Sequence, residues 1–102
     1  MLELRPNCEL CDKDLPPTST DARICTYECT FCASCVDRVL KNVCPNCGGG
    51  FVTRPIRPND ARRPGVSLRY QPASDSRVHT KYSKQEIVDF SLSVKDIPPE
   101  DR

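Results

Sequence analysis

The hydrophobic positions of this chain form a clear periodic pattern only near its C-terminal end. Four apolar residues recur there at the spacing of one helix face, namely Ile87, Phe90, Val94 and Ile97. Ser83 followed by Glu86 fits a capping box at the start of this run, and Pro98 ends it. The pattern predicts a helix over 84–96. Its apolar stripe needs a surface, which is the rest of the chain, a second copy or a partner.

The middle of the chain carries weaker patterns. Phe51–Val52 predicts a short strand that returns to the N-terminal part. Three prolines within 54–65 favour an extended segment, because proline lacks the N–H that a helix or a central strand needs. Alternating apolar and polar residues predict another short strand over 66–70. The chain therefore divides into a head (1–53), a Pro/Arg-rich linker (54–82) and a short amphipathic helix with an acidic tail (83–102).

Composition changes this picture, because the chain has few large apolar residues with which to build a core. Only 37% of its 102 residues are hydrophobic and it has no Trp, so the head needs a further source of stability. Its eight cysteines all lie within 8–47. The N-terminus lacks the features of a signal peptide, and no apolar run reaches membrane-spanning length. We therefore expect a cytoplasmic protein, without membrane contact, whose paired cysteines bind metal.

The spacing of the cysteines is that of metal-binding loops. They follow the pattern Cys-x2-Cys-x13-Cys-x3-Cys-x2-Cys-x2-Cys-x8-Cys-x2-Cys. A Cys-x2-Cys loop can turn two sulfurs toward one ion, and a tetrahedral site takes two such pairs. The eight cysteines therefore predict two structural Zn²⁺ sites that leave no cysteine over. An iron–sulfur cluster is the alternative, because Cys29, Cys32 and Cys35 have the spacing of a bacterial ferredoxin; the next gap, however, is eight residues instead of three.

Spacing alone leaves the grouping of the cysteines open. Consecutive pairs would give one group of Cys8, Cys11, Cys25 and Cys29 and a second of Cys32, Cys35, Cys44 and Cys47. Interleaved pairs would give one group of Cys8, Cys11, Cys32 and Cys35 and a second of Cys25, Cys29, Cys44 and Cys47.

Residues 8–47 resemble a RING finger in which Cys29 stands where the fourth ligand is usually histidine. Every gap between the cysteines lies within the ranges of that family, and Pro45 follows the seventh ligand as it commonly does there. The resemblance implies a small, metal-stabilised α+β domain of the RING-like treble-clef type. It also implies the cross-brace, which is the interleaved grouping.

The chain is also similar to a small bacterial family catalogued as domain of unknown function 1272, a resemblance that implies no activity. It rests on Leu-Glu-Leu-Arg-Pro-Asn-Cys at 2–8, Cys-Asp-Lys-Asp-Leu-Pro-Pro at 11–17, Cys-Pro-Asn-Cys-Gly-Gly-Gly-Phe at 44–51 and Arg-Pro-Ile-Arg-Pro at 54–58.

RING ubiquitin ligases bind a conjugating enzyme in a shallow groove. The corresponding positions of this chain are Leu10, Leu40 and Pro45, so ligase-like activity is one function that the resemblance implies. The arginine that often follows the last RING ligand is replaced by Gly48, and conjugating enzymes are uncommon in bacteria. Leu10 and Leu40 fit the core of the head equally well.

The charge of the chain is concentrated in its middle. Residues 54–84 carry eight basic side chains and two acidic ones, whereas the head becomes strongly acidic once its cysteines are thiolates. The basic segment suggests a regulator that binds nucleic acid through Arg54, Arg57, Arg62 and Arg63, with an affinity that falls as salt rises. The same arginines could instead lie on the acidic head of their own molecule.

The sequence shows no arrangement of catalytic residues. Two zinc sites closed by four thiolates have no open position for water, and the single histidine, His79, lies in a polar stretch. We therefore expect a module without catalysis of its own that acts in protein interaction or scaffolding. Its partner would be an unidentified protein or a second copy that associates through 84–96. The candidate contact residues are Leu10, Leu40, Pro45, Ile87, Phe90 and Val94.

Overall fold

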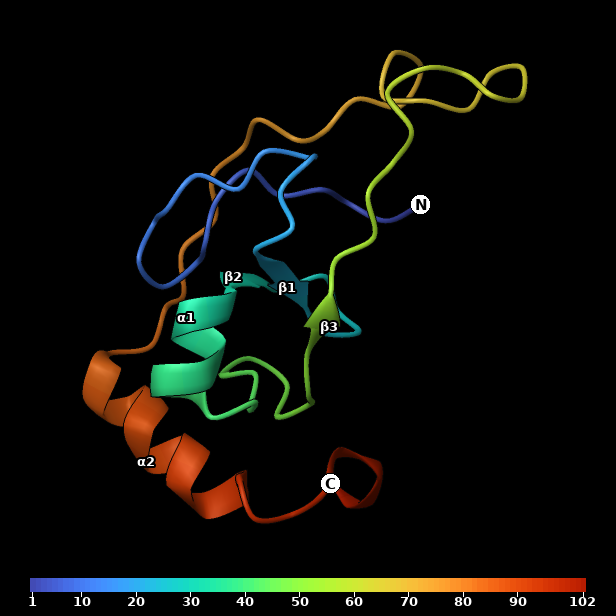
Figure 1. Cartoon of the computed structure of the whole chain (residues 1–102). Helices are drawn as coiled ribbons and strands as arrows, with labels where there is room; N and C mark the ends of the chain where they lie inside the picture. The colour runs from blue at the N-terminus through green and yellow to red at the C-terminus, as the bar shows by residue number, and fades with distance from the viewer.

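A three-stranded antiparallel sheet lies near the centre of the computed structural model, which describes residues 1–102 (Figure 1). Its strands are β1 (Ala22–Ile24), β2 (Thr30–Cys32) and β3 (Val52–Thr53), in the order β2-β1-β3. In β1 and β2, Ala22 pairs with Cys32 and Ile24 with Thr30. The expected return of Phe51–Val52 to the head is confirmed, because β3 pairs with β1.

The helical part of the head follows β2 directly. Helix α1 (Ala33–Cys35) continues into η1 (Val36–Leu40), a π-helical segment that ends where the Lys41 N–H donates to the Val36 carbonyl. Lys41 and Asn42 then adopt left-handed backbone conformations, with φ of 51° and 60°. Asn tolerates this conformation better than most residues. The turn lets the Asn42 side chain accept a hydrogen bond from the Phe51 N–H at 2.9 Å, which joins the end of η1 to the start of β3.

The core of the head is built from cysteines as much as from aliphatic residues. Six of the twelve buried residues in its cluster are cysteines. Phe31 of β2 is fully buried, and its ring meets that of Phe51 edge-on with the centroids 5.5 Å apart. Little apolar area is available beyond this cluster, so the metal sites must contribute much of the stability. The chain is therefore a small α+β structure organised around its cysteine-rich half.

The C-terminal helix α2 (Lys84–Val94) forms where the sequence predicts it. Its capping box is present, because Ser83 Oγ accepts from the Glu86 N–H at 3.2 Å and the Ser83 N–H donates to Glu86 Oε1 at 3.1 Å. The helix packs on η1 through Ile87, which is buried, and Ser91 Oγ donates to the Leu40 carbonyl at 2.8 Å. The first half of the apolar stripe thus finds its surface on the head of the same chain. Neither α2 nor any shorter helix has the length and apolarity of a membrane span.

We expect Ser83→Ala to loosen α2 without disturbing the head, because the Glu86 N–H loses its acceptor. Loss of an N-cap costs about 1 kcal/mol, so amide hydrogen exchange within 84–94 should be roughly five times faster in the zinc-loaded variant. Ser93→Ala is the control, since Ser93 Oγ bonds the Phe90 carbonyl within the helix. Equal exchange in wild type and Ser83→Ala would show that the capping box does not stabilise α2.

The strand predicted over 66–70 is wrong, because these residues lie in a tight turn. The N–H groups of Tyr70 and Gln71 donate to the Ser67 carbonyl at 3.1 and 2.8 Å. The Gln71 side chain accepts from the Ser67 N–H at 3.2 Å. These local bonds use the backbone groups that a strand would pair with a neighbouring strand, so the alternating residues do not form a strand.

The last part of the linker runs beside the first cysteine loop (Figure 1). The Thr80 N–H donates to the Glu9 carbonyl at 2.8 Å, and the Asn7 side chain exchanges hydrogen bonds with the backbone of Val78 at 2.8 and 3.2 Å. Because Asn7 is fully buried, this contact positions the linker on the head and leads the chain to α2.

Candidate metal centres

The first cysteine group draws its ligands from a loop and from the junction of β2 with α1. The sulfurs of Cys8, Cys11, Cys32 and Cys35 all lie within 4.8 Å of one another. The Cys11 and Cys32 sulfurs are 3.8 Å apart. A tetrahedral Zn²⁺ with Zn–S bonds of about 2.3 Å places its sulfurs about 3.8 Å from each other. The four side chains therefore fit a zinc ion.

The local backbone explains why the first loop can present two sulfurs. The Asp12 N–H donates to the Cys8 carbonyl at 2.9 Å, and the Cys8 N–H donates to the Lys13 carbonyl at 2.8 Å. Asp12 takes a left-handed conformation, with φ of 66°, which closes the turn behind Cys11. The Glu9 N–H also donates to the Thr30 carbonyl at 2.9 Å, so the loop is held against β2 next to Cys32.

The second group combines the turn of the β1–β2 hairpin with the last cysteine loop. The sulfurs of Cys25, Cys44 and Cys47 lie within 4.8 Å of one another. Cys29 is not within this limit, but its thiol is close enough to those of Cys44 and Cys25 for them to change its pKa. The Asn46 side chain donates to the Cys29 sulfur at 3.4 Å. Cys29 is therefore the residue beside this set that supplies the fourth ligand of a second four-cysteine site.

Backbone N–H groups point at the sulfurs of this second group, as they do in loops that bind zinc through thiolates. The Tyr27 N–H donates to the Cys25 sulfur at 3.3 Å, and the Gly49 N–H donates to the Cys47 sulfur at 3.4 Å. Gly48 has a φ of 79°, which disfavours side chains, and its N–H donates to the Cys44 carbonyl at 2.7 Å. Glycine is therefore favoured directly after the last ligand.

The two groups are those of the interleaved pairing, and the chain thus has two Zn²⁺ sites. The consecutive grouping does not occur, because Cys32 and Cys35 lie with the first loop. Each site joins segments distant in sequence, and β2 connects the two sites. Four thiolates in a closed, tetrahedral arrangement are the donor set of structural zinc. When bound, zinc supplies the positive charge and the cross-link that hold these segments together.

The thiols of the second group explain why the ion is needed. The pKa of Cys29 is lowered to about 5, because the Cys44 thiol and the Asn46 amide donate hydrogen bonds to its sulfur. The same contact raises the pKa of Cys44, whose proton is the one donated. Burial raises the pKa of Cys25 to about 11. Without a cation only part of the group can be ionised, so zinc binding must release protons.

The candidate contact residues differ in how far they are buried. Leu40 and Ile87 are wrong as partner-binding residues, because they are 0% and 2% exposed and pack in the core of the same chain. Leu10 is half-buried against that core. Pro45 is buried beside a hollow that it shares with Phe90. Helix α2 thus covers part of the surface that the RING resemblance assigns to a conjugating enzyme.

The linker arginines also divide into two sets. Arg54 is wrong as a nucleic-acid contact, because only 1% of it is exposed. Arg57 is half-buried, and its guanidinium donates to the carbonyls of Leu2 and Gln71 at 2.8 and 2.7 Å. Arg62 and Arg63 are exposed. Arg54 and Arg57 thus bind backbone carbonyls rather than acidic side chains, and all of these carbonyls except that of Gln71 belong to the head.

One acidic contact of the head was not predicted. Arg77 donates to Asp12 at 2.9 Å and to Asp14 at 2.7 Å, and Asp12 also accepts from His79 at 2.9 Å. These contacts hold the pKa of the Asp12 carboxyl below its ordinary value. The one signal in the sequence is the surplus of positive charge in the linker, and that surplus does not single out Arg77.

Both cysteine groups lie in the part of the chain that matches a known protein family. Residues 1–57 match the model of the family described as Protein of unknown function (DUF1272). An uncharacterized protein of Rhizobium meliloti (strain 1021) is 58% identical over 78 residues, which are 76% of this chain and 86% of that protein. No solved structure matches the chain. The family model includes both cysteine groups and Arg54 but ends before α2.

Proposed function

The chain belongs to the family described as Protein of unknown function (DUF1272), and from that premise we propose that it is a two-zinc, RING-like module that binds another protein and performs no catalysis itself. The treble-clef fold of this proposal is supported by the order of its parts, which are a cysteine hairpin, a helix and a final cysteine loop. The interleaved cysteine groups support the cross-brace.

An apolar hollow beside the second zinc site is the observation that carries this proposal. It has a volume of about 420 Å³ and lies between the hairpin turn, the last cysteine loop and the C-terminal segment. Its apolar lining includes Tyr27, Phe90, Val94, Ile97 and Pro99. Single exposed apolar side chains are common, but a group of them around a hollow is typical of an interaction site.

The hollow depends on the second zinc site for its shape. Tyr27 lies between two ligands of the hairpin turn, and Phe90 of α2 packs against Gly48, directly after the last ligand. Arg102 also lines the hollow, and it donates to the Gly48 and Asn42 carbonyls at 3.1 and 2.8 Å. Zinc would thus act structurally, by holding together three segments that present one apolar surface.

The proposal predicts that a photo-crosslinking amino acid at position 27 captures a partner protein in cells. Phe90→Asp should abolish the crosslink, because a carboxylate in the hollow disfavours an apolar partner. Val52→Asp is the matched control, since Val52 is a large exposed apolar residue on β3 and lies outside the hollow. Both variants should keep their zinc.

Light scattering of the same proteins separates a second copy from a different partner. A wild-type dimer that becomes a monomer in Phe90→Asp would identify self-association through 84–96. A crosslink that survives Phe90→Asp, or that Val52→Asp abolishes equally, would contradict the proposed surface.

A further inference from the structure

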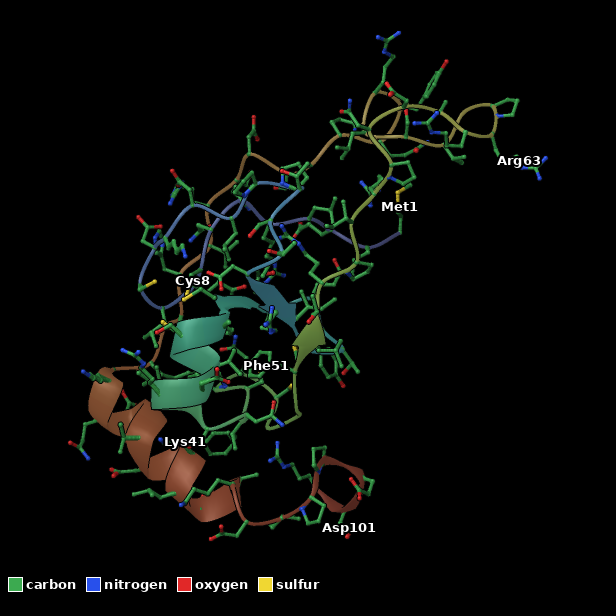
Figure 2. All side chains as sticks on the ribbon, in the orientation of Figure 1. Met1, Cys8, Lys41, Phe51, Arg63 and Asp101 are labelled. Atoms are coloured by element: carbon green, nitrogen blue, oxygen red, sulfur yellow. The ribbon has the colours of Figure 1, made fainter.

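A compact loop at the far end of the molecule from α2 has no role in either zinc site. Residues 58–71, here called the tip loop, begin and end close together because the Leu68 N–H donates to the Pro58 carbonyl at 2.8 Å. The Gln71 side chain crosses the loop and donates to the Gly65 carbonyl at 2.8 Å. Figure 2 shows the loop standing clear of the head, with Arg63 at its outer end.

The tip loop is held in place although it contains no strand or helix. Ser67 is 1% exposed at its centre, where its carbonyl accepts two N–H groups from the following residues. The base is fixed by Arg57, which bonds both Leu2 at the N-terminus and Gln71 at the end of the loop. The loop therefore presents its side chains from a preorganised backbone, so less entropy is lost when they bind a ligand.

The arginines of the chain differ in whether their side chains already have partners. Six of the ten donate hydrogen bonds within the protein, namely Arg5, Arg23, Arg54, Arg57, Arg77 and Arg102. The other four are Arg38 on η1 and Arg62, Arg63 and Arg69, and the last three all lie on the tip loop. None of these three forms an ion pair, and Asp60 is the only acidic residue of the loop.

An aromatic ring accompanies these free guanidinium groups. Tyr70 is next to Arg69 in the chain, and 59% of it is exposed. The loop contains no lysine, so its positive charge is carried only by planar groups that can donate two parallel hydrogen bonds to a phosphate. Arginine forks beside an exposed ring are the combination with which proteins bind the backbone and bases of single strands.

We propose that the tip loop binds single-stranded nucleic acid, with Arg62, Arg63 and Arg69 on phosphates and Tyr70 stacked on a base. This site is separate from the apolar hollow, because α2 and the C-terminal segment, which line the hollow, lie at the other end of the molecule (Figure 1). The chemistry favours nucleic acid over an acidic protein segment, because a carboxylate-bearing peptide would leave the exposed ring without a stacking partner. The binding is independent of base sequence, since the backbone supplies most of the contacts.

Fluorescence anisotropy of the zinc-loaded protein with labelled single-stranded RNA and DNA 12-mers, at several salt concentrations, tests this site. Three phosphate contacts give a slope of log K against log salt of about −2. Changing Arg62, Arg63 and Arg69 to Ser should lower the affinity at least ten-fold at low salt and remove most of that slope. Tyr70→Ala should weaken binding roughly five-fold or more with little change in slope, because stacking carries no charge.

Arg38→Ser is the matched control, because Arg38 is exposed and unpaired on the head. It should leave the affinity unchanged, whereas an equal loss in this variant would show only general attraction to a basic protein. Circular dichroism and zinc content should match wild type in every variant, since the side chains removed make no bonds within the fold. Failure of both 12-mers to bind at low salt, or displacement of them by polyglutamate of equal charge, would overturn the proposal.

Discussion

Removing zinc under reducing conditions is expected to unfold the whole head, not one site at a time. Binding of a structural zinc contributes about 10 kcal/mol or more to folding, which is comparable with the entire stability of a small domain. Half of the buried cluster consists of cysteines, so little packing remains when the ions leave. A chelator with reductant should therefore abolish the NMR dispersion of residues 8–51 and reduce the far-UV circular dichroism of the protein. Added Zn²⁺ should restore both signals.

The interleaved arrangement makes the two sites interdependent. Strand β2 begins directly after Cys29 of one site and ends at Cys32 of the other, and its central residue, Phe31, is fully buried. Loss of either ion frees one end of this strand and exposes the core around that ring. Cys35→Ser, which removes a ligand of the first site only, should therefore also unfold the second site. Cys44→Ser, which removes a ligand of the second site only, should also unfold the first.

Two single-site variants give the decisive comparison. Ser34→Ala serves as the control, because Ser34 is exposed beside a ligand and should change neither zinc content nor folding. If Cys35→Ser retained dispersed signals around Tyr27 and the last cysteine loop and still held one zinc ion, the sites would fold independently. The cross-brace would then have no energetic consequence.

The metal sites could be predicted from the sequence because their signal is local and chemical. Cysteine pairs at close spacing define the ligands wherever the intervening chain goes, and only their grouping needed the fold. Helix α2 was equally clear, because a capping box and a four-position stripe agree with each other. The surface on which α2 packs could not be predicted, because periodicity shows that one face of a helix is apolar but does not show what covers that face.

The features that the sequence did not predict have several physical causes. Strands β1 and β2 have three residues each, too few for alternation to be visible. The turn at 67–71 replaced a predicted strand because Ser67 and Gln71 supply local hydrogen bonds. Arg54 looked like one of several linker arginines, yet three carbonyls from the first 16 residues converge on it. No sequence pattern marks a site made by carbonyl oxygens.

Replacing Arg54 by Met should cost the zinc-loaded protein about 3 kcal/mol of unfolding free energy. The Arg54 guanidinium donates to the carbonyls of Arg5, Leu15 and Pro16 at 2.8, 3.2 and 3.0 Å. These acceptors flank the loop that carries Cys8 and Cys11. A buried acceptor left without a donor costs about 1–3 kcal/mol, and Met fills a similar space but donates nothing.

An opposing effect limits this loss. The Arg54 side chain is buried without a carboxylate partner, burial lowers its pKa, and its Nε–H has no acceptor. Removing a buried charge of this kind recovers desolvation energy. The expected loss of unfolding free energy is therefore closer to that of leaving one or two carbonyls unpaired than to that of leaving all three unpaired. Arg54→Lys should lie between Met and wild type, because a single ammonium cannot reach three acceptors in the fork geometry of a guanidinium.

Denaturant unfolding of the zinc-loaded protein measures the effect, and competition with a chelator measures its consequence for the first site. Loosening the carbonyls around Cys8 and Cys11 should weaken zinc there by about 10-fold or more, as loss of other residues that support metal ligands does. Arg62→Met is the control, since its side chain is exposed and its removal should cost less than about 0.5 kcal/mol. A Met variant as stable as wild type would mean that desolvation of the guanidinium cancels its three hydrogen bonds. Arg54 would then fix the path of the chain after β3 without stabilising the fold.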